Sequence, residues 1–270
     1  MKFKVELPES ELKCWKENLN IFESKIPTFN ELAFKDKWNS IYYRYESARN
    51  FLILAIEPDY ESLFEINNCS ANTKKYFEIC CKKDFYEAAL MNYNILIDYS
   101  WQLVYFCFEF VSYSKDKQID LDNWISIEES RNLLNKLEKN VSCPGNDECP
   151  FKYFKKFKDN SEYIDIFELI NSFWNNFKNS NLRKYYNLIK HCGNLIYQEI
   201  EEIKNSKIRC NAKIEGQSIA INVKDIKDSV SLKKLLEELK DFDNNILMDY
   251  LCNLLNKLKS LMNISDLVYL

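Results

Sequence analysis

Glycine and proline are scarce in this sequence: 3 Gly and 5 Pro occur in 270 residues. Tight hairpin turns depend on these two residue types, so a large sheet of hairpin-connected strands is disfavoured. Apolar residues make up 46% of the chain and aromatic residues 15%, which is the composition of a folding sequence. A chain of this length can bury one large core or two modest ones. We therefore expect a mainly α fold, built as a bundle of long antiparallel helices.

The few helix-breaking and helix-capping residues predict where helices begin and end in the N-terminal half. A first helix follows Pro8, and the capping-box spacing of Thr28–Glu31 opens a second helical stretch that Pro58 stops. The segment 70–115 contains no Gly or Pro. We expect it to break near the sequence CKKD and to continue as a long helix from about Phe85.

The most apolar window, residues 88–111, predicts a central buried helix and no membrane span. Asp98, Gln102 and Glu109 interrupt it, so no uncharged run reaches the length of a span. The first ten residues have no apolar signal core, which argues against secretion. Ten cysteines in such a chain are expected to be reduced thiols, and we expect a cytoplasmic location.

The C-terminal half has one segment with strand periodicity. Polar and apolar residues alternate on both sides of Glu215-Gly216, which predicts a β-hairpin within 207–223. Amphipathic patterns predict helices elsewhere, at 126–140, 162–178, 181–204, 229–241 and 243–263. We expect residues 1–206 to form the helical bundle. Residues 207–270, the hairpin and two helices, should pack on the same domain.

Positive charge is concentrated in one part of the chain. Residues 151–191 hold eight Lys or Arg and four Asp or Glu, whereas the whole chain has a formal charge of -4. Within this segment, FKYFKKFKDN places Lys155 and Lys156 among aromatic residues. Lysines can follow a nucleic-acid backbone while exposed aromatics stack on bases. For the aromatic residues we prefer the alternative, in which the segment is an amphipathic helix and packs these rings on the core.

His191 is the only histidine of the chain. Residues four apart on a helix differ by only about 40° around the axis, so Arg183, Asn187 and His191 would form one stripe. A guanidinium can hold a phosphate, an amide can orient a group, and an imidazole can move a proton near neutral pH. Lys184 and Lys190 would add charge for RNA. The alternative is an ordinary solvated helix face.

The segment LRKYYNLIKHCG resembles HEPN domains, a family of small α-helical domains that includes many ribonucleases. Its signature is an arginine, four to six intervening residues and a histidine; here seven residues separate Arg183 from His191, and Lys184 follows the arginine. The spacing N-x-x-K-H-x-G of some divergent groups fits residues 187–193. The resemblance covers about a dozen residues, with a HEPN-like core of roughly 30–206. It implies a homodimer with one composite cleft and metal-independent RNA cleavage that leaves a 2′,3′-cyclic phosphate.

The sequence contains no motif for a metal site, a nucleotide-binding loop or a dinucleotide-binding fold. An HExxH zinc site needs two histidines, and the chain has one. Its three glycines are scattered, so they cannot form a Walker loop or a dinucleotide-binding fingerprint. Cys143 and Cys149 lack the spacing of a zinc site. We expect no metal and no cofactor.

The leading hypothesis is a HEPN-like metal-independent endoribonuclease in a toxin–antitoxin or anti-phage defence context. Its partners would be RNA, a second copy of the chain and a possible protein regulator. Arg183, Asn187 and His191 would be catalytic, and the RNA-binding residues would be Lys155, Lys156, Lys184 and Lys190. The alternative is a non-catalytic HEPN-like helical scaffold that dimerises or binds a protein partner.

Overall fold

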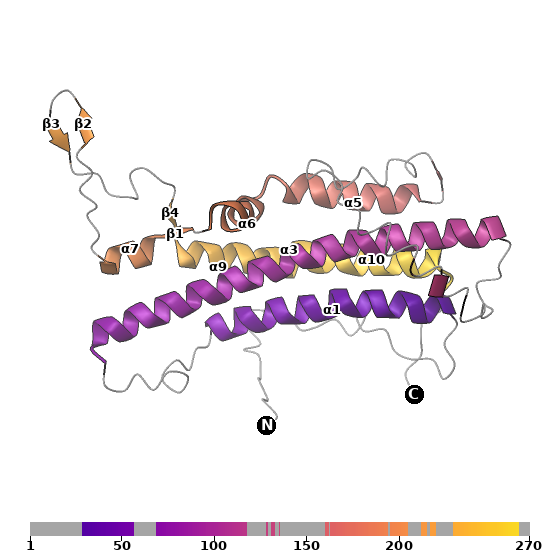
Figure 1. Cartoon of the computed structure of the whole chain (residues 1–270), viewed down its shortest axis with the longest axis horizontal. Helices are drawn as coiled ribbons and strands as arrows, with labels where there is room; N and C mark the ends of the chain where they lie inside the picture. Colours follow the sequence, from indigo (N-terminus) through magenta and orange to yellow (C-terminus); the bar gives the residue numbers. More distant parts are fainter. Residues whose placement is uncertain are drawn as a thin grey trace. The chain divides into compact units, whose positions relative to one another are not determined.

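The computed structural model describes residues 29–56, 69–117, 128, 131–132, 135, 160–161, 163–193, 195–204, 212–214, 217–219 and 229–264. These residues are predominantly helical, which confirms the predicted mainly α class (Figure 1). The main helices are α1 (Phe29–Ile56), α3 (Ala71–Lys117), α5 (Ile164–Phe177), α6 (Asn181–Cys192), α7 (Gln198–Lys204), α9 (Leu232–Asp241) and α10 (Met248–Leu261). None of the helices among these residues is long and apolar enough to cross a membrane.

The two longest helices run without interruption. Helix α1 ends at Ile56, two residues before Pro58, as the sequence predicted. The predicted break near CKKD is wrong, because α3 is helical through all 47 of its residues. Opposite charges four residues apart pair there: Lys82 Nζ is 2.6 Å from Glu78 Oε1, and Lys83 Nζ is 3.9 Å from Glu87 Oε2. Pairs at this spacing stabilise a helix, so the charged cluster continues α3.

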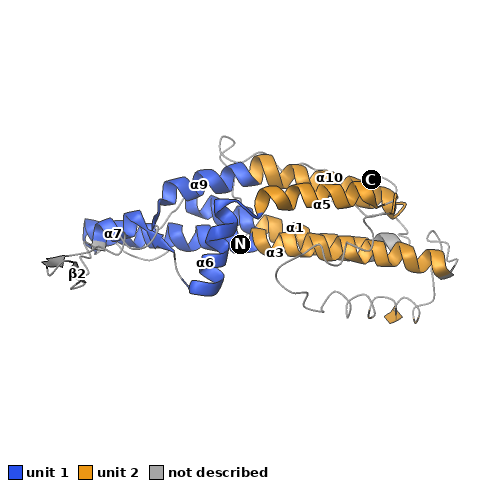
Figure 2. Ribbon diagram, turned by 90° about the horizontal axis from the view of Figure 1, so that it is seen from above, with its two compact units in different colours: residues 1–8, 47–92, 178–242 blue, residues 9–46, 93–177, 243–270 orange. Residues whose placement is uncertain are grey.

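The chain divides into two units that interleave along the sequence, coloured separately in Figure 2. Unit 1 comprises residues 1–8, 47–92 and 178–242, and unit 2 comprises residues 9–46, 93–177 and 243–270. The second half of α1 thus belongs with the first half of α3 in unit 1, and the opposite halves belong together in unit 2. The predicted antiparallel arrangement of the long helices stays a prediction.

Aromatic residues from different helices form the core of unit 2. The Phe173 ring of α5 stacks on the Tyr250 ring of α10, with centroids 3.9 Å apart. Trp101 of α3 meets Trp174 edge to face at 5.2 Å. The Ser100 hydroxyl lies 2.9 Å from the Tyr250 hydroxyl, so the buried phenol has a hydrogen-bond partner. These contacts fix α3, α5 and α10 together, and the window 88–111 is confirmed as a largely buried helix.

Unit 1 contains the remaining helices and the strands. The predicted single helix 181–204 is wrong: α6 ends at Cys192, strand β1 (Ile196–Tyr197) follows, and α7 begins at Gln198. Strand β1 pairs in parallel with β4 (Ser229–Val230), a pairing that the sequence did not predict. Strands β2 (Ala212–Ile214) and β3 (Gln217–Ile219) are antiparallel and pair Ile214 with Gln217, which confirms the hairpin.

The C-terminal helices are joined without a gap. Between α9 and α10, the π-helical segment η4 (Phe242–Leu247) replaces the expected interruption at residue 242. It contains Asp243, whose side chain is 0% exposed. Such π segments insert a residue into a helix and shift the faces on either side of it. Leu247 and Met248 are also buried, so the helical path continues into the core of unit 2.

Several predicted elements lie wholly or largely outside the described residues. They are the helix after Pro8, most of the helix at 126–140, the loop with Cys143 and Cys149, and the basic segment 151–159. Within 126–140, the described residues Glu128, Arg131, Asn132 and Asn135 are helical. The predicted boundary at residue 206 stays a prediction.

Candidate functional site around helix α6

Helix α6 has a defined start and a defined end. The Ser180 hydroxyl oxygen caps the helix by accepting a hydrogen bond from the backbone N–H of Arg183 at 3.2 Å. Gly193 ends the helix with φ 86°, and its N–H donates to the Ile189 carbonyl oxygen at 3.2 Å. Apart from the neighbouring residues and the backbone of α6 itself, no atom of the described residues lies within 4 Å of the position where a Cβ would sit on Gly193. The glycine is therefore required by its backbone conformation, and its role is to terminate the helix beside His191.

One face of α6 packs against α9. The buried residues of α6 are Leu182, Tyr185 and Tyr186. At the start of the helix, the Asn181 side-chain amide donates to Glu238 Oε1 of α9 at 2.8 Å. Apolar burial and this polar contact together fix how the helix is rotated about its own axis.

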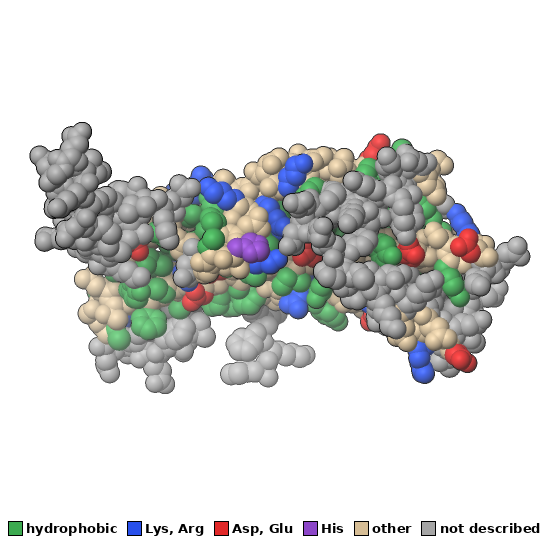
Figure 3. All heavy atoms as spheres, turned by 45° about the horizontal axis from the view of Figure 1, so that its top comes forward, with side chains coloured by type: hydrophobic (Ala, Val, Ile, Leu, Met, Phe, Trp, Pro, Cys, Tyr) green, Lys and Arg blue, Asp and Glu red, His purple; other side chains and the backbone are tan. Residues whose placement is uncertain are grey.

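The opposite face of α6 is polar and carries the predicted residues. Lys184, Asn187, Lys190 and His191 are exposed, and Arg183 is half-buried. The 12-residue helix contains no Asp or Glu. Figure 3 shows the imidazole at the molecular surface, among Lys and Arg side chains. The structure thus brings these five residues onto one electropositive face.

The distances along α6 assign different tasks to these residues. The Cα atoms of Arg183 and His191 are eight positions apart along the helix, a rise of about 12 Å. A phosphate in contact with His191 is therefore nearer to Lys190 and Asn187 than to the backbone of Arg183. Arg183 is placed to hold a neighbouring phosphate of the same strand, so the face fits a polyanion better than a single small anion.

Two of the cations lie on one aromatic ring. Arg183 Cζ is 4.9 Å from the centroid of the Tyr186 ring, and Lys190 Nζ is 5.8 Å from the same centroid. Both distances are within the range of cation–π attraction. The Tyr186 ring is 6% exposed, so its position is fixed by the packing of α6. Sequence reasoning missed this residue, although its spacing from both cations, three and four residues, was a readable signal.

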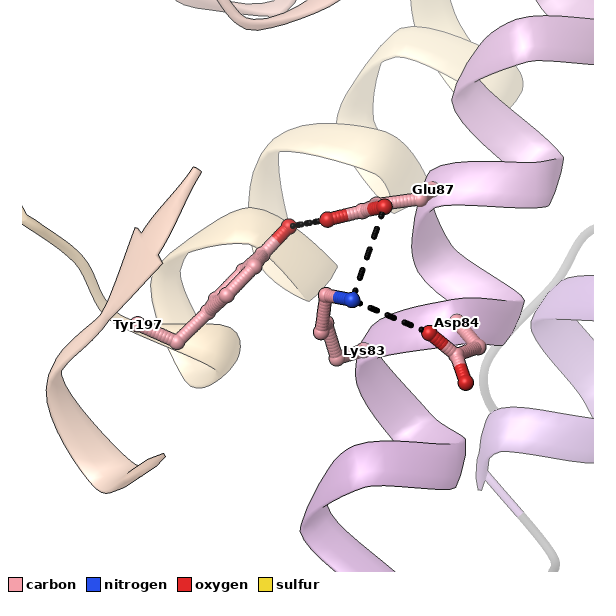
Figure 4. A network of polar contacts seen from close by, with 4 residues as sticks. All are labelled: Lys83, Asp84, Glu87 and Tyr197. Atoms are coloured by element: carbon pink, nitrogen blue, oxygen red, sulfur yellow. Dashed lines mark hydrogen bonds and ion pairs between the residues drawn. The ribbon is translucent and has the colours of Figure 1, made fainter. Parts of the chain in front are cut away.

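The segment after His191 is anchored to α3 by a polar network, drawn in Figure 4. The Tyr197 hydroxyl of β1 donates to Glu87 Oε1 at 2.9 Å. Lys83 Nζ lies 3.9 Å from Glu87 Oε2 and 3.1 Å from Asp84 Oδ1. The network holds strand β1 on α3 and so fixes the path of the chain beyond Gly193.

Burial changes the proton affinity of two groups in this network. Burial raises the pKa of the Glu87 carboxyl above its ordinary value, and the Tyr197 hydrogen bond and the Lys83 charge oppose that rise. Burial, followed by the charge of Glu87, raises the pKa of Tyr197. The phenol therefore remains protonated and serves as a hydrogen-bond donor.

Helix α9 is capped by a residue of α7. Glu199 accepts hydrogen bonds from the Leu232 N–H at 2.9 Å (Oε1) and 3.1 Å (Oε2), and from the Ser231 hydroxyl at 2.8 Å. A carboxylate at a helix N-terminus satisfies free N–H groups and complements the helix dipole. Glu199 thus links α7 to α9, which in turn supports α6.

Lys155 and Lys156 lie outside the described residues, so their part in RNA binding stays a prediction. Among the residues that the structure describes, no group of three or more His, Cys, Asp or Glu side chains could hold a metal ion. Compared with protein-family models, curated proteins and solved structures, the chain matches none.

Proposed function

We propose that this chain is a HEPN-like endoribonuclease that cuts RNA through attack by a ribose 2′-hydroxyl. The observation that carries the proposal is the exposure of His191 on a helix face that also presents Arg183, Lys184, Asn187 and Lys190 and no acidic residue. Such a face attracts phosphates and places a proton-transfer group among them. Metal independence and a role in a toxin–antitoxin or anti-phage defence system follow from the resemblance of LRKYYNLIKHCG.

In the proposed reaction, His191 takes the proton of a ribose 2′-hydroxyl. The 2′-oxygen attacks the adjacent phosphorus, the bond from phosphorus to the 5′-oxygen breaks, and a proton passes to that oxygen. The products are a 2′,3′-cyclic phosphate and a 5′-hydroxyl. Lys190 offsets the charge that develops on the phosphoryl oxygens, Asn187 orients the phosphate by hydrogen bonding, and Arg183 holds the neighbouring phosphate of the same strand.

The reaction needs a base and an acid, and the chain has one histidine. A homodimer would supply a second imidazole, so that one His191 removes the 2′ proton while the other protonates the leaving oxygen. In a heterodimer of wild-type and His191→Ala chains, one imidazole of the pair is missing. Its activity should be far below half of the wild-type value, whereas independent sites would retain half.

The test is cleavage of a purified RNA in the presence of a chelator by the wild type, His191→Ala and Cys192→Ala. Cys192 is the matched control, because it is the next residue of the same helix turn and is also exposed. Loss of proton transfer should reduce the rate by about 10²- to 10⁴-fold in His191→Ala, with little change in Cys192→Ala. Equal rates for all three proteins, or no cleavage by any of them, would overturn the proposal. The second result would favour a scaffold that dimerises or binds a protein.

A further inference from the structure

Tyr186 is related to two cations by helix geometry. Arg183 precedes it by three residues and Lys190 follows it by four, and both spacings place side chains next to each other on one helix face. The charged groups lie 4.9 Å and 5.8 Å from the ring centroid. The ring is buried, whereas Lys190 reaches solvent. Tyr186 therefore underlies the cations and does not itself present its ring to a ligand.

One ring lies within cation–π range of two charges that are far apart along the helix. The Cα positions of Arg183 and Lys190 are seven residues apart along the helix, a rise of about 10 Å along the axis. Two long cationic side chains on a bare helix repel each other and sample many rotamers. The negative face of an aromatic ring attracts both and limits that freedom. Stacking on a ring uses the face of the guanidinium plane, whereas hydrogen bonds to a phosphate use its edge.

We propose that Tyr186 is a positioning residue that holds Arg183 and Lys190 as a preformed pair for RNA phosphates beside His191. The inference rests on the proposed function, since it names a residue that prepares the same face for its substrate. Tyr186 acts through the two cations and makes no contact with RNA. Its contribution is to reduce the side-chain ordering that binding would otherwise require.

The first test is RNA binding by Tyr186→Phe and Tyr186→Leu, measured by fluorescence anisotropy with a labelled single-stranded RNA at fixed salt. Phenylalanine keeps the ring, so its affinity should stay within about twofold of the wild type. Leucine removes the ring, and ordering two long side chains without it should weaken binding by about tenfold. Equal affinity of the Leu and Phe variants would overturn the inference.

A shape-preserving series covers the case in which the Leu variant fails to fold. Phenylalanines with increasing numbers of ring fluorines, incorporated at position 186, keep the ring volume while they weaken its negative face. Affinity for RNA should fall progressively along this series. A flat response in folded proteins would show that Tyr186 only fills space, and would overturn the inference.

An NMR measurement without RNA separates failure of this inference from failure of the proposed function. Side-chain protons of Arg183 and Lys190 should be shifted upfield by the ring in the wild type and in Tyr186→Phe, and not in Tyr186→Leu. Ordinary shifts in the wild type would overturn the positioning role itself. Upfield shifts in a wild-type protein that binds no RNA would instead overturn the proposed function, and with it the use of the pair for phosphates.

Discussion

Replacing Tyr197 with phenylalanine tests the network that anchors the chain beyond His191. The change removes one hydroxyl and keeps the buried ring. The lost hydrogen bond is the 2.9 Å contact with Glu87 Oε1, in a region where the phenol is 2% exposed and the Glu87 side chain is 16% exposed. Among the described residues, the Lys83 ammonium at 3.9 Å is the group left to compensate the carboxylate.

The expected loss of stability depends on the charge of Glu87. A hydrogen bond to a charged group contributes about 1.5–3 kcal/mol, and a bond between neutral groups about 0.5–1.5 kcal/mol. At a pH above the folded-state pKa of Glu87, where the carboxylate is ionised, Tyr197→Phe should reduce the free energy of unfolding by about 2 kcal/mol. At about pH 4, where Glu87 is largely protonated in the folded state, the loss should be about half as large.

The sign of the pH dependence follows from the raised pKa of Glu87. Because the folded-state pKa lies above the unfolded value, folding takes up a proton. The stability from this group is fully present below the unfolded pKa and is lost as pH rises through the folded pKa. Removing the Tyr197 hydrogen bond raises the folded pKa further, so the variant should lose more stability on going from acid to neutral pH than the wild type.

Urea unfolding followed by circular dichroism at the two pH values measures these differences. The matched control is Tyr43→Phe, since Tyr43 is 62% exposed; its effect should stay within about 0.5 kcal/mol at both pH values. A Tyr197→Phe loss that is the same at both pH values would refute the reasoning about Glu87. No loss at either pH would refute the anchoring role of the hydrogen bond.

Three further predictions concern α6 and its supports. Gly193→Ala should destabilise the protein by about 1–3 kcal/mol in urea unfolding, because φ is 86° there; unchanged stability would contradict the helix-terminating role. Glu199→Ala should reduce stability by about 1–2 kcal/mol through loss of the α9 cap; the exposed Glu202→Ala on the same helix should have little effect, and equal effects would contradict the cap. Arg183→Gln should reduce the slope of log affinity for single-stranded RNA against log salt by about 0.7, and an unchanged slope would exclude a phosphate contact.

The sequence predicted those features that depend on local signals. The scarcity of Gly and Pro predicted long helices, Pro58 predicted the end of α1, and the Glu215-Gly216 pair predicted the hairpin. The periodicity of 181–192 placed Arg183 and His191 on one polar face. These features follow from neighbours within a few residues, which is the range over which helix and turn preferences act.

The errors arose where two local signals competed. The helix predicted at 181–204 runs through Gly193, but the positive φ of this residue ends α6. The charges around Lys83 were interpreted as a break, whereas their spacing supports α3. The η4 segment has the same apolar pattern as an α-helix and differs only in its hydrogen-bond register, so the pattern did not reveal it.

Contacts between residues far apart in the chain could not be predicted from the sequence. The Tyr197–Glu87 hydrogen bond joins residues 110 apart in sequence, and the Glu199 cap joins residues 33 apart. A single sequence does not pair such positions, because hydrogen-bonding residues are common on every helix. The sequence therefore predicted the polar face of α6 but not the groups that hold it in place.

The most direct measurement of the central claim compares an RNA oligonucleotide with a DNA oligonucleotide of the same base sequence, incubated with the wild type and with His191→Ala. Under the proposed function, the wild type cuts only the RNA and leaves 2′,3′-cyclic phosphate and 5′-hydroxyl ends, and His191→Ala cuts neither. Cleavage of the DNA, RNA products with 5′-phosphate ends, or wild-type activity in His191→Ala would contradict it.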